Sequence, residues 1–552
     1  MKRIVVCSDG TGNSSNKGRG TNVFKLFESL DLTGHHTDPE LTPQIALYDD
    51  GVGTEDFKPL KVFAGATGFG LSRNVRQLYR ELVRVYDPGD EIFVFGFSRG
   101  AFTVRSLVGF IATCGLLDAR RFATSAALRK AVRKAYRLYR QCYRTKLQEL
   151  LLGPLDEYHA QVFRSLWCHP GEVRVRFVGV WDTVDAVGLP FHLSDILNSV
   201  VYRFKFPDQR LSAIVDEACH ALAMDDERHS FHPLLWDERG DPHPARIDQV
   251  WFAGAHSNVG GGYPKQGMSL VALDWMAAKA RAAGLRLIGG DRQFYGDHAN
   301  VDDKLYDPRS GAGIFYRWKI RDVASMCARN GVTPKVHVSV LERVAHGTDD
   351  YAPGNFPFGA QVVVTPEEAP AGRPSLTELR AAEVQDVLKA APAGSLLDGV
   401  KPARLAGLLS YYLYLIAITL LVLVATAGDL TTAADPRVVL HGVGGLVVGI
   451  LTSPFATLAA VAKQVWKTPS LLALPGFGLL LAYGLALSAD RRMNAVFSGF
   501  WHTAQPALRK ALMRVRERMI ESAGADALAA AVRPEALPAA PPATATAELQ
   551  HS

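Results

Sequence analysis

The chain has 552 residues, of which 48% are hydrophobic and 21% charged, and its formal net charge is +6. That length can bury a large core, and so small a charge argues against a nucleic-acid partner. The six cysteines show no CxxC spacing, so we expect buried apolar thiols, with no metal site and no cofactor.

Residues 1–360 alternate between apolar strands and helical patterns. The expected strands are Arg3–Cys7, Gln44–Tyr48, Glu91–Phe95, Val173–Val180, Gln249–Ala253 and Lys335–Val340. Helical patterns lie between several of them, as in Val75–Val85, Ala101–Ile111 and Leu270–Ala283. We therefore expect an α/β fold, with a mostly parallel sheet covered by helices on both faces.

The first strand ends in the turn Asp9-Gly10-Thr11-Gly12-Asn13, which is rich in backbone N–H groups. A phosphate-binding loop is one interpretation, but the lysine of a Walker motif is absent. The backbone N–H groups of Gly10 and Thr11 are better motivated as oxyanion donors. Enzymes of the α/β-hydrolase fold take one such donor from an early strand-to-helix loop.

The segment Gly96-Phe97-Ser98-Arg99-Gly100 lies between an apolar strand and a helix-compatible segment. In that context G-x-S-x-G is typical of a nucleophile elbow, where Gly96 and Gly100 permit a strained turn and a close strand–helix approach. The turn would set the Ser98 hydroxyl at a helix N-terminus, with the backbone N–H of Arg99 as the other oxyanion donor. Alone, the motif also occurs by chance.

Residues 119–148 carry ten arginines and lysines and no acidic residue. Val132, Tyr136 and Tyr139 share one helical face, which predicts a basic amphipathic helix. We expect residues 119–170 to form a helical cap inserted into the catalytic domain. Two roles stay open: a solvated helix packed through its tyrosines, or a cap that contacts anionic lipid headgroups.

A nucleophilic serine needs a general base, and that base needs an orienting carboxylate. In α/β-hydrolases the chain order is Ser, then Asp or Glu, then His. Asp182 follows one predicted strand and His256 a later one, so both should lie at the carboxyl edge of the sheet with Ser98. The competing acid and bases are Asp185, His220, His229 and His232.

The composition changes beyond residue 360. Residues 361–400 are rich in Pro, Ala and Glu, and we expect a linker with one short helix. Leu405–Gly428 is uncharged and long enough to cross a bilayer. Two further apolar spans, Val438–Ala462 and Thr468–Ala489, contain Ser-Pro and Pro-Gly breaks and could form a hairpin or a broken span.

These spans predict a membrane region at 401–490 with two or three transmembrane helices. Basic residues flank the spans on both sides, so the positive-inside rule fixes no orientation. Buried helices of a soluble protein are the alternative. Residues 491–552 predict a basic helix and a disordered Pro/Ala-rich tail.

The blocks SDGTGN, YDDGVGT, GFSRGAFTVRSLVGFI, GVWDTVDAVG and VWFAGAHSNVGGGY follow one another along residues 3–345. In this the sequence resembles an uncharacterised α/β-hydrolase family best known for phospholipase effectors of the bacterial type VI secretion system. The resemblance implies Ser98 as nucleophile, Asp182 as acid and His256 as base. It also implies hydrolysis of carboxylic esters, typically glycerophospholipid acyl esters. Asn258 stands where the family block usually has an aspartate.

We therefore expect a membrane-associated serine hydrolase of phospholipase A type, with a phospholipid membrane and its lipids as partners. The resemblance adds a secretion-system or immunity protein as a partner. The expected location is a bacterial inner membrane, crossed several times with the catalytic domain in the cytoplasm, or a target cell after delivery. The alternatives are a non-catalytic binding protein on the same fold and a nucleotide-binding membrane protein that uses the Asp9–Gly12 loop.

Overall fold

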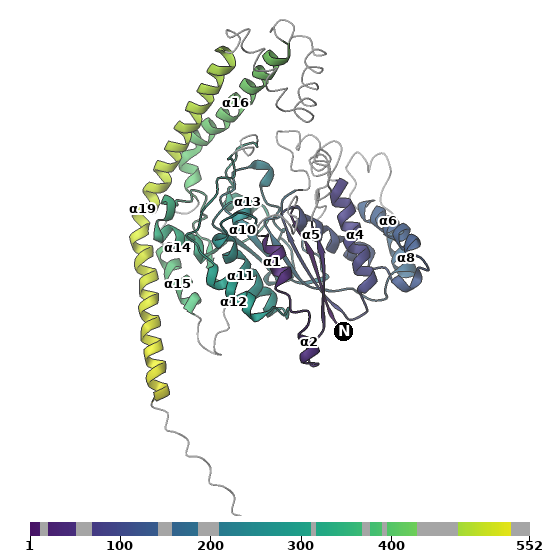
Figure 1. Cartoon of the computed structure of the whole chain (residues 1–552). Helices are drawn as coiled ribbons and strands as arrows, with labels where there is room; N and C mark the ends of the chain where they lie inside the picture. Colours follow the sequence, from purple (N-terminus) through teal and green to yellow (C-terminus); the bar gives the residue numbers. More distant parts are fainter. Residues whose placement is uncertain are drawn as a thin grey trace, which may run out of the picture.

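Eight strands form one sheet, in the order β2-β1-β3-β4-β5-β6-β7-β8, and all neighbours in that order are parallel (Figure 1). This computed structural model describes residues 1–10, 20–50, 69–141, 157–185, 209–310, 316–366, 376–388, 395–427 and 473–531. The strands are β1 (Arg3–Ser8), β2 (Gln44–Asp49), β3 (Glu91–Phe97), β4 (Val175–Trp181), β5 (Val215–Ala223), β6 (Ile247–Phe252), β7 (Lys335–His337) and β8 (Gln361–Val363). The predicted α/β class with a parallel sheet is confirmed.

The sequence analysis does not predict strands β5 and β8, and it makes the strand that corresponds to β7 too long. The first half of β5 carries Asp216 and Glu217, which break the apolar run, and β8 has only three residues. The predicted strand Lys335–Val340 is wrong after His337, where the chain turns into a helix. The His337 side chain accepts a hydrogen bond from the backbone N–H of Ser339 and so caps that helix.

Different helices cover the two faces of the sheet. Ile4 and Val6 of β1 point into one core with the first group of helices, whereas Val5 and Cys7 point into another with the second group. The first group is α4 (Phe69–Val85), α5 (Arg99–Cys114), α6 (Ser125–Gln141) and α8 (Glu157–Trp167). The second group is α1 (Asn22–Glu28) and α11 (Gly267–Ala282).

The remaining α-helices are short connections or belong to the C-terminal half. They are α2 (Gly34–Thr37), α10 (His256–Gly260), α12 (Gly289–His298), α13 (Val323–Arg329), α14 (Val338–His346), α15 (Leu376–Leu388), α16 (Lys401–Ala427) and α19 (Ala473–Ala531).

The basic helix α6 packs on the domain through its tyrosine face. Tyr136 and Tyr139 are buried, and their rings lie 5.5 and 5.4 Å from the ring of Phe110 on α5. Its arginines and lysines therefore line the outer side of the helix. Residues 142–156, which include the end of the predicted basic helix, lie outside the described residues.

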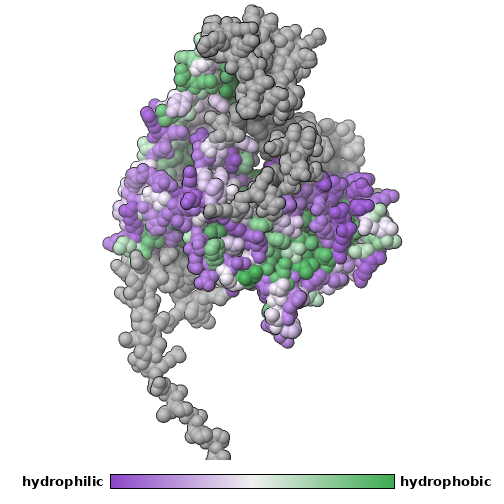
Figure 2. All heavy atoms as spheres, in the orientation of Figure 1, coloured by the Kyte–Doolittle hydropathy of each residue, from purple (hydrophilic) through white to green (hydrophobic). Residues whose placement is uncertain are grey.

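Helices α16 and α19 form an antiparallel hairpin that extends away from the sheet (Figure 1). The Ser410 hydroxyl donates a hydrogen bond to the carbonyl oxygen of Ala482 at 2.6 Å. Length and composition alone make Leu396–Leu421 and Ala473–Met513 candidate membrane spans, and the exposed hairpin is apolar (Figure 2). The predicted span Val438–Ala462 lies outside the described residues.

The third predicted span lies partly outside the described residues, which resume at Ala473. From there Pro475 and Gly476 belong to helix α19. The helix then continues past residue 490, where we placed the end of the membrane region, and returns to the α/β domain.

The C-terminal part of α19 is built into the core beside the last strands. Trp501 is 1% exposed and donates a hydrogen bond from its indole N–H to the carbonyl oxygen of Pro353 at 3.0 Å. Its ring packs against Phe356 and Phe358. Strand β8 and helix α15, both within the predicted linker, share the same core. The hairpin is thus anchored to the sheet through α19.

Replacing Trp501 with alanine should lower the free energy of unfolding by about 3–5 kcal/mol, because a large buried ring and its hydrogen bond are lost. Urea unfolding of the full chain in neutral detergent, followed by circular dichroism, measures the change. Val496→Ala, an exposed change on the same helix, is the control and should alter stability by less than about 0.5 kcal/mol. Equal effects of the two changes would contradict the anchoring role.

Candidate active site

The turn after β3 has the geometry of a nucleophile elbow. Ser98 adopts φ 59° and ψ −123°, a conformation that L-residues rarely take, and α5 begins at the next residue. A Cβ on Gly96 would lie 2.7 Å from the Ala101 backbone, and one on Gly100 would lie 2.1 Å from the carbonyl oxygen of Ser8. Both glycines are therefore required by the close approach of helix α5 to strands β3 and β1.

His256 reaches Ser98 from the end of β6. It is the first residue of α10, and its Nε2 lies 2.8 Å from the Ser98 Oγ. The rings of Phe97 and Phe231 lie 4.6 and 5.1 Å from the imidazole and hold its plane. The backbone N–H of His256 donates to the carboxylate of Asp226 at 3.2 Å.

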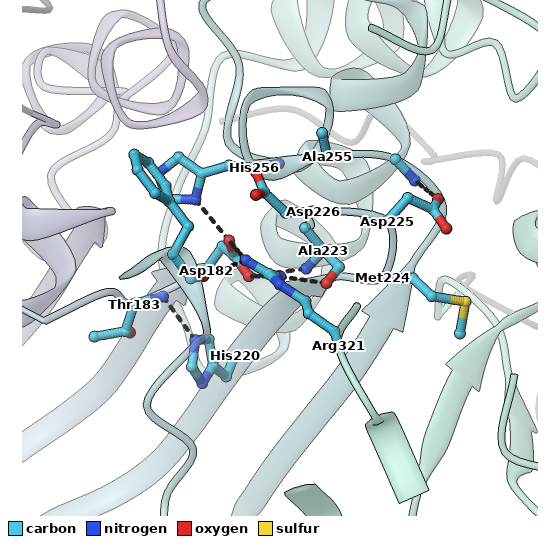
Figure 3. Close-up of polar contacts among 12 residues, drawn as sticks. Asp182, Thr183, His220, Ala223, Met224, Asp225, Asp226, Ala255, His256 and Arg321 are labelled. Carbon is cyan, nitrogen blue, oxygen red and sulfur yellow. Dashed lines mark hydrogen bonds and ion pairs between the residues drawn. The ribbon is translucent and has the colours of Figure 1, made fainter. Parts of the chain in front are cut away.

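Asp182 completes the arrangement from the end of β4. Its Oδ2 lies 2.6 Å from the Nδ1 of His256, and its side chain is fully buried (Figure 3). Arg321 donates to both carboxylate oxygens, at 2.8 and 2.9 Å, and the backbone N–H of Ala223 donates to Oδ1 at 3.0 Å. The three predicted catalytic residues thus meet in one hydrogen-bonded chain.

Burial and charge set the protonation of this pair. Burial alone would raise the pKa of Asp182, but Arg321 and His256 outweigh it and hold that pKa well below its usual range. The pKa of His256 is lowered overall. Burial lowers it most, Asp182 raises it, and the charge of Arg228 lowers it further. At neutral pH the site therefore holds an ionised aspartate and a neutral imidazole, as a general base requires.

The structure places only two of the three predicted oxyanion donors, and their N–H groups have different surroundings. Arg99 is the first residue of α5, so its N–H belongs to the helix end that favours negative charge. The N–H of Gly10 donates to the carboxylate of Asp9 at 2.5 Å, so in this structure it is directed at its neighbour. Thr11 lies outside the described residues.

The competing residues have other partners. The Nε2 of His220 accepts a hydrogen bond from the backbone N–H of Thr183 at 3.1 Å (Figure 3). The Nε2 of His232 lies 2.9 Å from the carbonyl oxygen of Lys319. Burial lowers the pKa of His220 and of His232 to about 3. The histidine bonded to Ser98 is His256, and the carboxylate bonded to His256 is that of Asp182.

Asn258 stabilises the chain around His256 and forms no hydrogen bond with its imidazole. Its side-chain oxygen accepts from the backbone N–H of Ala255 and of Tyr306, each at 3.3 Å. Its amide nitrogen donates to the carbonyl oxygen of Lys304 at 3.0 Å, a bond that a carboxylate could not make. The asparagine amide therefore satisfies two backbone donors and one backbone acceptor at this position.

The sequence analysis missed Arg321, Asp226 and Arg228. Arg321 is fully buried between Asp182 and the backbone carbonyls of Ala223 and Phe231. It lies in a connecting segment, 139 residues after Asp182, and nothing in the local sequence marks it. The pair of Asp226 and Arg228 lies in the DDERH segment, whose charge density was the one available signal.

A cavity of about 380 Å³ lies where the hairpin meets the domain. Five aromatic side chains line it, together with apolar and charged groups: Tyr316, Trp318, Tyr411, Tyr414 and Tyr483. The ring of Tyr316 lies 5.4 Å from that of Phe231, which itself contacts His256. Two ring contacts therefore separate this cavity from His256.

Nothing in the described residues suggests a metal centre, since no three His, Cys, Asp or Glu side chains there are grouped to hold an ion.

A model of the family described as "T6SS, Phospholipase effector Tle1-like, catalytic domain" matches residues 2–279. The chain belongs to this family. Membership covers β1 to α11 and supports a phospholipase or lipase function.

Three relatives show how far the likeness extends. The Saccharomyces cerevisiae "Uncharacterized protein YEL023C" is 29% identical over 249 residues, 43% of this chain and 33% of that protein. "Crystal structure of an uncharacterized protein from Pseudomonas aeruginosa" shares 16% identity over 70% of this chain and 59% of that chain, with TM-score 0.31. "Structure of the Tle1 effector bound to the VgrG spike from the Type 6 secretion system" shares 20% identity over 48% and 51%, with TM-score 0.26. The chain thus spans about a third of the yeast relative's length.

Replacing Arg321 with methionine should lower the free energy of unfolding by about 3–5 kcal/mol, because Asp182 would be left as a buried charge without its partner. The double change Arg321→Met/Asp182→Asn should be less destabilising than Arg321→Met alone. Urea unfolding measures both.

The control is Arg120→Met, which removes an arginine that is 73% exposed from its pair with Asp118 and should change stability little. If Arg321→Met is as well tolerated as the control, the buried pair does not stabilise the site.

Proposed function

We propose that the chain is a membrane-associated serine hydrolase that cleaves acyl esters of glycerophospholipids through an acyl-enzyme. The supporting observation is the hydrogen-bonded chain Ser98–His256–Asp182 at the carboxyl edge of the sheet. Family membership supports the substrate class, and the geometry supports Ser98 as nucleophile, His256 as base and Asp182 as acid.

The reaction follows from the positions of these groups. As the Ser98 Oγ attacks the ester carbonyl, the Nε2 of His256 accepts its proton and Asp182 stabilises the resulting imidazolium. The N–H of Arg99 stabilises the oxyanion. His256 then donates the proton to the departing lysophospholipid oxygen, which leaves the acyl group on Ser98. A water molecule, deprotonated by His256, attacks that ester, releases the fatty acid and restores Ser98.

The hairpin of α16 and α19 is the proposed membrane attachment. Its apolar surface is exposed, and the aromatic cavity at its base lies beside Tyr316 and Phe231. Tyrosine and tryptophan are enriched where proteins cross the bilayer surface. We propose that a lipid enters the site through this junction. The number of membrane crossings and the residence in a bacterial inner membrane stay part of the proposal.

Delivery to a target cell by a type VI secretion system, with a spike protein and an immunity protein as partners, is proposed from family membership. A resident membrane lipase has the same active site. Asn258 was the one residue that suggested a non-catalytic protein. Its side chain bonds to backbone groups, and this leaves His256 in place as the proposed base. Nucleotide binding at Asp9 is disfavoured, because its buried carboxylate already accepts the Gly10 N–H.

Ser98→Ala should abolish release of fatty acid and lysophospholipid, because the proposed acyl-enzyme forms on the Ser98 hydroxyl. Mass spectrometry of lipid products from phospholipid vesicles measures this, and the acyl position follows from the lysolipid formed. Ser106→Ala, a buried serine in the same helix, is the control and should retain activity. Undiminished hydrolysis by the Ser98 variant would exclude the proposal.

The pH profile tests the role of His256. Activity needs the neutral imidazole, whose pKa is lowered, so the acid limb of kcat/KM for a soluble ester should have its midpoint below about 6.5. Arg228 helps to lower that pKa, so Arg228→Gln should move the midpoint to higher pH.

Arg239→Gln is a matched control, because Arg239 forms the same local pair with Asp237 but on the surface. Its profile should equal that of the parent. A wild-type midpoint above 6.5, or a downward shift in the Arg228 variant, would argue against His256 as the base.

A further inference from the structure

A cup lined by five arginines lies between helices α4 and α6. Its volume is about 240 Å³, and none of its lining residues belongs to the active site. The lining residues are Arg73, Arg76, Arg80, Arg129 and Arg133, with Gln77 and Val132. We propose that this arginine cup binds a ligand that carries clustered phosphate groups.

Helical periodicity brings these side chains together. Arg73, Arg76 and Arg80 follow one another at spacings of three and four on α4, and Arg129 and Arg133 are four apart on α6, so each set shares one helix face.

Beneath the cup, Tyr136 of α6 joins the two helices. Its hydroxyl donates to the Ser72 hydroxyl at 3.1 Å, and the Arg76 guanidinium lies over its ring at 5.6 Å. The two arginine rows are therefore held facing each other by packing.

Positive charges gathered in this way repel unless an anion lies between them. No acidic residue lines the cup, and α6 contains none. The one acidic residue of α4 is Glu81. Burial raises the pKa of Asp49 on β2, and the nearby charge of Glu81 raises it further.

Arg76 donates from its Nε to the carbonyl oxygen of Ser72 at 2.8 Å, a neutral partner that leaves its charge unpaired by an acid. Among the ion pairs of the described residues, none involves Arg76, Arg80, Arg129 or Arg133. The Nε of Arg80 is buried without a hydrogen-bond acceptor in this part of the chain. An anion bound between the two arginine rows would offset their repulsion.

The chemistry of the lining favours phosphate. A planar guanidinium offers two parallel N–H groups that match two oxygens of a phosphate, which the ammonium of lysine cannot do. The two lysines beside the lining arginines on α6, Lys130 and Lys134, do not line the cup. Five guanidinium groups in one concavity call for a ligand with more than one negative charge.

The cup lies near the edge of the sheet that carries Ser98, since Asn74 of α4 donates to the carboxylate of Asp49 at the end of β2 at 2.8 Å. Helix α4 follows β2 and starts at the carboxyl edge of the sheet, the edge that carries Ser98, and the α16–α19 hairpin extends beyond the same side (Figure 1). The surface over α6 is hydrophilic (Figure 2). Clustered phosphates of an anionic phospholipid and those of a soluble polyphosphate share this chemistry, and the experiment separates them.

The test uses the full chain with Ser98→Ala, in neutral detergent micelles, so that no lipid is consumed and hydrolysis plays no part. Calorimetric titration measures binding of inorganic triphosphate and of micelles doped with cardiolipin, whose headgroup carries two phosphates. Micelles doped with phosphatidylcholine are the blank. The variant is Arg129→Gln/Arg133→Gln, and the matched control is Lys130→Gln/Lys134→Gln, which removes the same charge from the adjacent positions of the same helix.

The parent should bind at least one anionic probe, and the arginine variant should bind it about tenfold or more weakly for each guanidinium lost. The lysine control should stay within about twofold of the parent, since it removes charge without touching the cup. Thermal unfolding of both double variants establishes that they are folded.

Binding of triphosphate alone assigns a soluble ligand, and binding of cardiolipin micelles assigns a lipid headgroup; either supports the cup. Equal weakening by the two double variants would mean a diffuse basic surface and would overturn the proposal. A parent that binds neither probe would overturn it as well.

Discussion

The buried carboxylate of Asp182 is the group on which the active site depends. An isolated charge with no exposure is very costly, and here Arg321, Ala223 and His256 surround it with hydrogen bonds. Arg321 in turn donates to the backbone carbonyl of Phe231, whose ring packs on His256. The same contacts therefore keep the acid ionised, fix the tautomer of the base and hold its ring toward Ser98. A change at any of these contacts should therefore disturb the hydrogen bond between His256 and Ser98.

Parallel strand pairing brings these groups together. Phe97 of β3 pairs with Trp181 of β4, so the residues that follow them, Ser98 and Asp182, leave the sheet side by side. The backbone N–H of Ser98 still donates to the carbonyl oxygen of Trp181 at 3.0 Å. Both residues take positive φ values, 59° and 37°, a strain of about 1–3 kcal/mol each that the surrounding core must offset. The strained backbone lies at Ser98 and Asp182, whose side chains turn away from the paired strands to form the proposed active site.

The sequence predicts the part of this site that follows apolar strands. The later parts of β3, β4 and β6 are continuous buried runs, and such runs can be recognised without a structure, so Ser98, Asp182 and His256 could be placed at one edge. β5 could not be found, because Asp216 and Glu217 interrupt its pattern. Arg321 is invisible to pattern analysis, since a buried ion pair across 139 residues leaves no local periodicity. The return of α19 to the core likewise depends on tertiary packing, which composition does not encode.

The apolar hairpin extends beyond the edge of the sheet that carries Ser98 (Figure 1). This placement, together with family membership, is why we favour a phospholipid substrate. The most direct measurement is labelling of the full chain with a fluorophosphonate probe, followed by peptide mass spectrometry. The account predicts one phosphonate adduct on Ser98, which is lost on His256→Ala although the serine remains. Folded protein with Ser98 unlabelled would contradict it.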